Sequence, residues 1–280
     1  MSDKIKIEKN SVQETLVIPL YGRKLCSTRF PQVYVDESAA DICERLDYDF
    51  GELDQSMKGF MWEFGALETA VRQFDMECEV SDYLSAHPKA AIVNLGCGLD
   101  NMPRKSDNGQ CLFYNVDFPD IIEAREQIIP AGERETNIAC DLTDHSWMKQ
   151  VDGGNGAVFY GAGVFHYLKM ADVKALVLAM AEQFPGGRLV FDTVGKFGYK
   201  MMLRTALKNW DMNDATGMCY VKDPEREMGP WSPKVAVSSK PYLFGYGAMD
   251  HEGIPFRYKL LARIGDNLMH MNIIRMDFAE

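Results

Sequence analysis

The chain has 280 residues, of which 46% are hydrophobic and 25% are charged, and its formal net charge at pH 7 is −11. This is the composition of a globular protein with ample material for a core, and its acidity argues against nucleic acid as a main partner. The chain contains neither a run of 18 uncharged apolar residues nor an apolar signal-peptide centre, so we expect no membrane partner and a cytoplasmic location.

Residues 1–85 have mainly helical patterns. Apolar residues recur with helical spacing over 39–46 and again over 65–74. A strand is possible at 15–18, where Pro19 would end it. We therefore expect a helical N-terminal cap over 1–85.

Residues 86–195 alternate between short apolar strands and helices. We expect strands at 91–95, 111–116, 136–140, 156–160 and 188–192, and helices at 119–128 and 171–183. Strands that alternate with helices pair in parallel through right-handed crossovers. The pattern therefore predicts an α/β core with a mostly parallel sheet.

The last third of the chain changes character. A helical pattern at 201–207 is followed by segments rich in Gly, Pro and Ser. We expect 196–255 to be an inserted cover over the sheet edge and the substrate. Apolar runs at 257–262 and 271–278 predict a strand pair that closes the core over 256–280.

The first strand of this core ends in the turn Gly96-Cys97-Gly98, and Asp117 ends the second strand. Glycines permit positive φ angles and a close approach of the backbone to a ligand. An acid after the neighbouring strand can accept hydrogen bonds from both hydroxyls of a ribose. The third glycine of a dinucleotide-binding motif is missing, which favours a nucleoside without phosphates, such as S-adenosylmethionine.

The turn belongs to an ordered set of motifs. These motifs lie at 18–25, 66–75, 93–100, 113–119, 140–142 and 163–168. The set resembles the leucine carboxyl methyltransferase family, and its bacterial polyketide-synthesis branch, the tetracenomycin-type O-methyltransferases, is the closer likeness. The resemblance implies a Rossmann-like class I methyltransferase sheet with an antiparallel C-terminal strand, and S-adenosyl-L-methionine as the cofactor, with S-adenosyl-L-homocysteine as the product.

The resemblance also implies contacts with the nucleoside. Asp117 would accept from the ribose hydroxyls, and Asp141 would accept from the adenine amino group, with Leu142 supplying a backbone N–H and an apolar contact. Either acid could instead cap the segment that follows it. The other predicted contacts on this wall are Asn94, Gly96, Cys97, Gly98 and Phe118.

The methionine end of the cofactor would be held by a cation. In the resembling family an arginine at the position of Arg72 binds the cofactor carboxylate, and a planar guanidinium suits that contact. Arg72 could instead pair internally with Asp75 or Glu68. Lys24 or Arg23 is a candidate for a second carboxylate anchor.

One position departs from the family pattern. The family often carries a glutamate before the Gly-Val pair of its fourth-strand motif, whereas this chain has Ala162. The backbone carbonyls of Gly161 and Ala162 could still face the cofactor amine. We therefore predict one polar contact fewer on this wall of the site.

The acceptor side is predicted from side-chain chemistry. His166 is a candidate general base. Candidate acceptor contacts are the aromatic residues Tyr21, Tyr167, Trp210, Trp231, Tyr242 and Phe244. These aromatic side chains could equally form a buried cluster under the cover.

The function that these patterns favour is direct in-line methyl transfer to a carboxylate or hydroxyl oxygen of a small molecule. A carboxylate acceptor needs no base, whereas a hydroxyl acceptor does. One alternative is a protein that kept the fold and lost catalysis, and another is a protein C-terminal carboxyl methyltransferase. A nicotinamide-dependent reductase is disfavoured by the missing third glycine and by the lack of a Tyr-x-x-x-Lys pair after the fourth strand.

The seven cysteines are widely spaced and include no Cys-x-x-Cys pair. This pattern predicts reduced thiols and argues against a disulfide framework or a metal site. We expect a monomer or a homodimer whose partner is a small-molecule acceptor.

Overall fold

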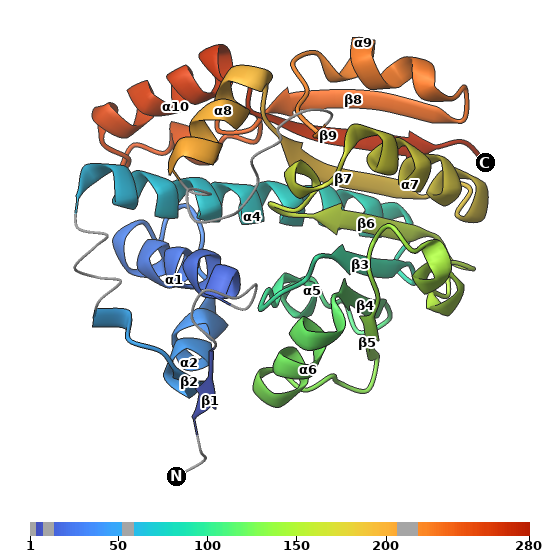
Figure 1. Cartoon of the computed structure of the whole chain (residues 1–280), viewed down its shortest axis with the longest axis horizontal. Helices are drawn as coiled ribbons and strands as arrows, with labels where there is room; N and C mark the ends of the chain where they lie inside the picture. Colours follow the sequence, from blue (N-terminus) through green and yellow to red (C-terminus); the bar gives the residue numbers. More distant parts are fainter. Residues whose placement is uncertain (1–3, 8–13, 52–58, 206–217) are drawn as a thin grey trace.

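The computed structural model describes residues 4–7, 14–51, 59–205 and 218–280. A seven-stranded sheet forms the centre of this fold, with helices on both of its faces (Figure 1). Two short strands, β1 (Ile5–Lys6) and β2 (Leu46–Asp47), pair with each other apart from this sheet.

The order of the strands in the sheet is β5-β4-β3-β6-β7-β9-β8. Their bounds are β3 (Ala91–Leu95), β4 (Leu112–Asp117), β5 (Glu135–Ala139), β6 (Ala157–Gly161), β7 (Arg188–Thr193), β8 (Val235–Pro241) and β9 (Asn272–Phe278). Strands β3 to β7 pair in parallel, and β9 is antiparallel to both of its neighbours, β7 and β8. The prediction of a mostly parallel sheet with an antiparallel C-terminal strand is confirmed.

Helices cover the two faces of the sheet. The long helix α4 (Phe60–Ala86) packs across β6 and β7, and α1 (Glu14–Arg29) packs on α4. The other helices are α2 (Glu37–Arg45), α5 (Met102–Lys105), α6 (Pro119–Ile128), α7 (Met170–Gln183), α8 (Lys196–Thr205), α9 (Pro224–Met228) and α10 (Phe256–Leu268). Short 3₁₀ turns are η1 (His145–Gln150), η2 (Phe165–Tyr167), η3 (Gly229–Trp231) and η4 (Ala248–Asp250). None of these described helices is long and apolar enough to cross a membrane.

The central strands are apolar because both of their faces are covered. Every residue of β3, β6 and β7 is buried. Alternate side chains enter different cores: Val158 and Tyr160 of β6 belong to the core under α4, whereas Ala157 and Phe159 belong to the core under α7. Continuous apolar runs of this kind are typical of parallel strands between two helical layers.

Two expectations for the ends of the chain were wrong. Residues 15–18 lie in helix α1, which continues through Pro19, so no strand forms there. Residues 257–262 lie in helix α10, not in a strand. The apolar residues of α10 recur every four positions, which is a helical period that the shorter window concealed.

The predicted cover over 196–255 contains part of the sheet itself. Strand β8 lies within that range and pairs along its whole length with β9. The strand pair that closes the sheet is therefore β8–β9, and not two neighbouring segments of the tail. The remaining domain boundaries stay predictions.

The order of the strands locates a crevice. The chain moves outward from β3 in one direction through β4 and β5, and in the other direction through β6 and β7. In open α/β sheets, ligands bind outside the carboxyl ends of the strands where the strand order reverses. The loops after β3, β4, β6 and β7 therefore form the edge at which a functional site is expected.

Candidate functional site

The turn after β3 requires glycine at two positions. Gly96 has φ 65° and Gly98 has φ 44°, in the left-handed region that strains other residues. A Cβ on Gly96 would lie 2.5 Å from a methyl group of Val164, and a Cβ on Gly98 would lie 2.9 Å from Leu16. Backbone conformation and packing therefore explain both glycines without a ligand. The Gly96 N–H donates to the carbonyl of Val116 at 2.8 Å, which holds the turn beside β4.

Asp117 is fixed beside this turn at the end of β4. Its Oδ2 accepts from the Gly98 N–H at 2.8 Å, and its Oδ1 accepts from the Phe118 N–H at 2.8 Å. Burial raises the pKa of Asp117, and the two backbone hydrogen bonds oppose this shift. A carboxylate has about four lone-pair sites, so both oxygens can accept further hydrogen bonds. Asp117 is thus suited to a pair of neighbouring hydroxyl groups.

A buried polar network holds the backbone that follows the glycine turn. Asp100 accepts from the amide of Asn94 at 3.1 Å and from the hydroxyl of Tyr160 at 2.7 Å. Arg125 donates to the carbonyls of Gly98 and Asp100 at 3.0 and 2.7 Å. Asn94, a predicted cofactor contact, therefore uses its amide N–H to hold Asp100.

Of the two candidates for a second anchor on α1, Arg23 lies at the turn. Its Nε donates to Asp36 at 2.8 Å, and its Nη2 donates to the carbonyl of Leu99 at 3.1 Å. Lys24 lies 6.0 Å from the ring centroid of Tyr21, away from these contacts. Arg23 therefore attaches α1 to the glycine turn, and a second anchor for the cofactor carboxylate at Arg23 or Lys24 stays a prediction.

Arg72 lies on the other side of the crevice, paired with a residue that sequence reasoning missed. Its Nη1 is 3.3 Å from Oδ2 of Asp192, at the end of β7, and the Oδ1 of Asp192 accepts from the Gly163 N–H at 2.6 Å. Gly163 has φ 76°, and a Cβ there would lie 2.5 Å from Arg72 Nη1. The partner of Arg72 is therefore Asp192, not Asp75 or Glu68. Asp192 could have been found in the sequence as an acid at the end of the fifth apolar strand, just as Asp117 is at the end of the second.

The guanidinium of Arg72 is charged but incompletely bonded. Burial alone would lower the pKa of Arg72, but Tyr242 and Asp192 raise it, and the net shift is upward. Its Nε is buried and has no hydrogen-bond partner in the described part of the chain. An N–H in this position can only donate, so it is suited to an oxygen acceptor from a ligand.

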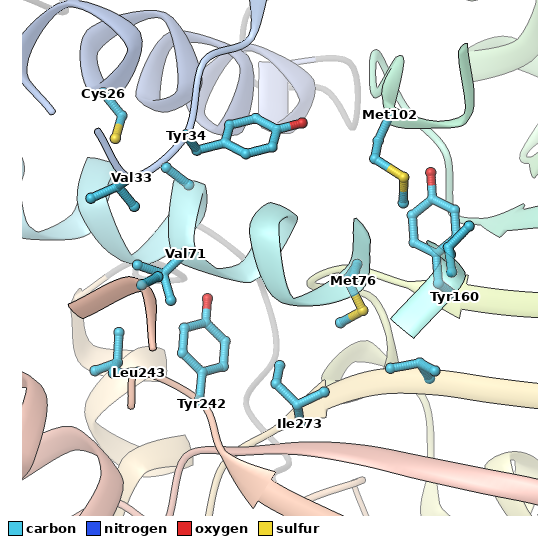
Figure 2. Close-up of a cluster of buried hydrophobic side chains, with 14 of the residues drawn as sticks. Cys26, Val33, Tyr34, Val71, Met76, Met102, Tyr160, Tyr242, Leu243 and Ile273 are labelled. Atoms are coloured by element: carbon cyan, nitrogen blue, oxygen red, sulfur yellow. The ribbon is translucent and has the colours of Figure 1, made fainter. Parts of the chain in front are cut away.

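Three of the predicted acceptor-side residues lie around Arg72. Burial lowers the pKa of His166 to about 4, opposed by Asp192 and reinforced by Arg72, so this imidazole is neutral at pH 7. Its ring lies 4.4 Å from that of Tyr167. Tyr242 directs its hydroxyl toward α4 (Figure 2), where it donates to the carbonyl of Glu68 at 3.0 Å.

The predicted adenine contacts lie at the same sheet edge as Asp117. Ala139, at the end of β5, is opposite Asp117 in the β4–β5 pairing, and Asp141 follows it. Asp141 is exposed, and its Oδ1 accepts from the N–H and the hydroxyl of Thr143, both at 2.8 Å. The local cap that was the alternative for Asp141 is therefore present. Leu142 is buried in the core under α7.

Two predicted contacts on the fourth-strand wall lie where β6 ends. Gly161 is buried, and a Cβ there would lie 2.6 Å from the ring of Phe165. Ala162 is partly buried and packs against the core under α4. Both residues precede Gly163, which lies against Arg72.

One predicted acceptor contact, Trp231, is not brought to this edge. Trp231 precedes β8, which runs in the same direction as β7, so it lies at the amino edge of the sheet, opposite the crevice. This corrects the expectation that Trp231 faces an acceptor. Tyr21 stacks on Phe50, with ring centroids 5.5 Å apart, and Phe244 donates its N–H to Asp266. Trp210 lies outside the described residues.

Two hollows in the described surface lie elsewhere. They measure about 360 and 410 Å³ and share Tyr34, Val35 and Lys105 in their linings. Neither includes Asp117 or Arg72, so the chemistry of the crevice does not coincide with these hollows. No group of three or more His, Cys, Asp or Glu side chains among the described residues could hold a metal ion.

Solved structures define the class of this fold. A Thermobifida fusca protein assigned as a methyltransferase aligns with a TM-score of 0.59 over 98% of this chain and 97% of its own, at 13% identity. The plantazolicin methyltransferase BamL, solved with S-adenosylhomocysteine (SAH) and a triazolic desmethylPZN analog, aligns with a TM-score of 0.52 over 96% and 100%, at 12% identity. At these identities the likeness shows the fold alone, which is that of class I methyltransferases.

The family follows from the sequence comparisons. The leucine carboxyl methyltransferase model matches residues 22–181, more than half of the chain. The chain therefore belongs to the leucine carboxyl methyltransferase family, whose cofactor is S-adenosylmethionine.

Two curated relatives are methyltransferases by name. The tetracenomycin polyketide synthesis O-methyltransferase TcmP of Streptomyces glaucescens is 28% identical over 189 residues, 67% of this chain and 68% of its own. The S-adenosyl-L-methionine-dependent methyltransferase dpfgK of Gibberella zeae is 28% identical over 270 residues, 90% and 89% of the two chains.

Proposed function

We propose that this protein is an S-adenosylmethionine-dependent O-methyltransferase that acts on a carboxylate or hydroxyl oxygen of a small molecule. The observation that carries the proposal is the placement of opposite charges on the two sides of one crevice. Asp117 lies on the β4 side of the glycine turn, and Arg72 lies over the ends of β6 and β7. S-Adenosylmethionine has matching groups, a ribose diol at one end and a carboxylate at the other.

The residues at this edge have the charges and hydrogen-bonding groups that suit this cofactor. Both oxygens of Asp117 are held by backbone N–H groups and can also accept from the ribose hydroxyls. Gly96, Cys97 and Gly98 bring the backbone to the same edge. The unpartnered Nε of Arg72 provides a donor for the cofactor carboxylate. We assign the adenine to the end of β5, near Asp141 and Leu142.

When bound, the cofactor supplies a methyl group on a sulfonium, which is already activated for displacement. The tasks of the protein are to align an acceptor oxygen with the methyl carbon and to keep water out. A carboxylate acceptor is ionised at pH 7 and requires no base. His166 is neutral at that pH, so its imidazole has a lone pair for the proton of a hydroxyl acceptor, and its pKa of about 4 makes it a weak base.

The names of the relatives favour a small acceptor. TcmP is named for O-methylation in polyketide synthesis. Methylation of a protein C-terminal carboxylate, which the family name suggests, is the second candidate for the acceptor. The third candidate is a binding protein without catalysis. Ala162 favours it, because the family often carries a glutamate at this position and the cofactor amine would lose that carboxylate here.

Calorimetry with S-adenosylmethionine and SAH tests the first step. Micromolar binding of both is expected, and a folded protein that binds neither would contradict the proposal. Mass spectrometry of methyl transfer to aromatic carboxylates, to phenols and to peptides with a free C-terminal leucine then separates the acceptors. Cofactor binding without transfer to any of these would favour the binding protein.

A further inference from the structure

Two buried hydroxyl groups without partners lie at the end of β7 and in the helix that follows it. The hydroxyl oxygens of Thr193 and Tyr199 have no hydrogen-bond partner in the residues that the structure describes. Thr193 is 1% exposed and Tyr199 is 0% exposed. Unpaired buried polar groups are rare and destabilising, so both require an explanation.

The fold holds these hydroxyls at the carboxyl edge of the sheet. Thr193 ends β7 directly after Asp192, the partner of Arg72. Tyr199 lies in the first turn of α8, where its N–H donates to the carbonyl of Gly195 at 2.9 Å. Burial raises the pKa of Tyr167, Arg72 opposes this shift, and Asp192 and the phenol of Tyr199 add to it, which places the two phenols near each other.

The backbone of residues 219–221 lies beside this region. The Cys219 N–H donates to the carbonyl of Leu168, after η2, and the Val221 N–H donates to the carbonyl of Val194, after β7, both at 2.9 Å. The ring of Tyr220 lies 5.7 Å from that of Tyr199. This segment therefore joins the loops after β6 and β7 and places Tyr220 beside the side chain of Tyr199.

We propose that the hydroxyls of Thr193 and Tyr199 form a subsite that donates hydrogen bonds to oxygen atoms of the methyl acceptor. This inference rests on the proposed function, which assigns the cofactor to β3–β5 and to Arg72 and leaves the other groups at the ends of β6 and β7 to the acceptor. Each hydroxyl has a proton to donate, and an arylamine nitrogen accepts it less well than an oxygen does because the nitrogen lone pair is delocalised into the ring. The subsite thus favours acceptors with a carboxylate, carbonyl or hydroxyl oxygen over arylamines.

Single-atom changes test this assignment. Tyr199→Phe and Thr193→Val each remove one hydroxyl and keep the shape of the side chain. Tyr220→Phe is the matched control, since it makes the same change on the neighbouring ring. The probes are 1-naphthoate, 1-naphthol and 1-naphthylamine, which share one carbon skeleton, and their affinities are measured by calorimetry on the whole protein saturated with SAH.

The expected result has three parts. The two oxygen probes bind the unaltered protein about tenfold more tightly than the amine, and Tyr199→Phe and Thr193→Val each weaken them about fivefold to tenfold, the usual effect of one lost hydrogen bond. Tyr220→Phe leaves all three probes unchanged. Neither hydroxyl deletion lowers Tm or SAH affinity, because these hydroxyls have no partner among the described residues.

Other outcomes overturn the inference. Equal affinity for the amine, probe binding that ignores both deletions, or a folded protein that binds SAH and none of the probes would each exclude the subsite. A Tm lowered by several degrees in Tyr199→Phe would show that the hydroxyl serves the fold instead. Failure to bind SAH would contradict the proposed function itself, and so the two failures are distinguishable.

Discussion

The two halves of the crevice are built differently. In the β3–β5 half, Asp117 is held by Gly98, 19 residues away, and by Phe118, its neighbour. In the β6–β7 half, Arg72 meets Asp192 across 120 residues, and Tyr242 reaches the carbonyl of Glu68 across 174. Both halves contain buried polar atoms without partners in the described chain, but the acid of the first half is held by nearby backbone, whereas the acid of the second half pairs with a side chain from a distant helix.

This difference suggests that the two halves bind different parts of the reacting pair. Groups that the backbone holds are already in their binding arrangement before a ligand enters. Such preorganisation suits the cofactor, because the same cofactor binds in every turnover. Side chains contributed by distant segments can differ in type and position without disturbing the glycine turn. We therefore expect the β3–β5 half to determine cofactor binding and the β6–β7 half to determine the acceptor, with Arg72 serving both.

Removing Arg72 is expected to have the largest effect. Arg72→Met leaves the buried Asp192 without its cation, and loss of one partner of such a pair destabilises a protein by about 3 kcal/mol or more. SAH affinity falls about a hundredfold, because the carboxylate of the ligand loses a charged donor. Denaturant unfolding and calorimetry measure the two effects.

The double variant Arg72→Met with Asp192→Asn separates these effects. It removes both charges, so we expect it to recover most of the stability and none of the affinity. Recovery of SAH affinity in the double variant would show that Arg72 acts on the fold and not on the cofactor.

The next effect concerns the acceptor half alone. His166→Ala should slow methyl transfer to a phenol by about a hundredfold, the lower end of the contribution of a general base because His166 is a weak one, and leave transfer to a carboxylate nearly intact. Because burial holds the pKa of His166 near 4, the base is already neutral across pH 6–8, so its protonation adds no pH dependence there. Steady-state kinetics on both acceptors provide the measurement, and an equal loss on both would exclude His166 as the base.

A smaller effect is expected from the cofactor half. Asp117→Ala removes an acceptor for the ribose diol, and we expect SAH and adenosine each to bind about thirtyfold more weakly. Arg72→Met should leave adenosine affinity unchanged, because adenosine has no carboxylate. Calorimetry with both ligands on both variants tests the division, and a loss of adenosine affinity in Arg72→Met would break it.

The smallest effect concerns a buried acid of α4 near the acceptor half. Both oxygens of Asp75 lack partners in the described chain, and burial, reinforced by Asp266 and opposed by Lys240, raises the pKa of Asp75 to about 9. Between about pH 4 and pH 9 the folded chain therefore binds a proton that the unfolded chain has lost, so stability falls as pH rises. Asp75→Asn removes this dependence and should be about 1–2 kcal/mol more stable than the unaltered protein at pH 8. The gain is limited because local opening of α4 lets water reach the ionised Asp75 without global unfolding.

The same variant should show little difference near pH 4, where both states of the unaltered protein are protonated. Glu77→Gln on the same helix is the control, since Glu77 pairs with Lys105 near the surface and should change stability by less than about 1 kcal/mol. Denaturant unfolding at several pH values distinguishes them. A gap between Asp75→Asn and the unaltered protein that does not widen with pH would rule out the protonated carboxyl.

Much of the fold could be predicted because its signals are local. The five parallel strands were expected within one or two residues of their bounds, since each is a short apolar run between turns. Helix α10 was expected as a strand because Arg257–Ala262, viewed alone, lacks the full helical period. Strand β8 was assigned to a cover because Gly and Pro surround it, and its pairing partner β9 is some thirty residues further along the chain.

The sequence by itself determined the turn, the acid that follows the next strand and the family, because these depend on backbone conformation and on strand ends that lie close along the chain. Only the tertiary structure decided that Asp192 holds Arg72, that Arg23 and not Lys24 reaches the glycine turn, and that Trp231 lies at the opposite edge. Those relations depend on how α1, α4 and β8 pack against the sheet. Packing is set by the summed burial of many side chains, and no single motif records it.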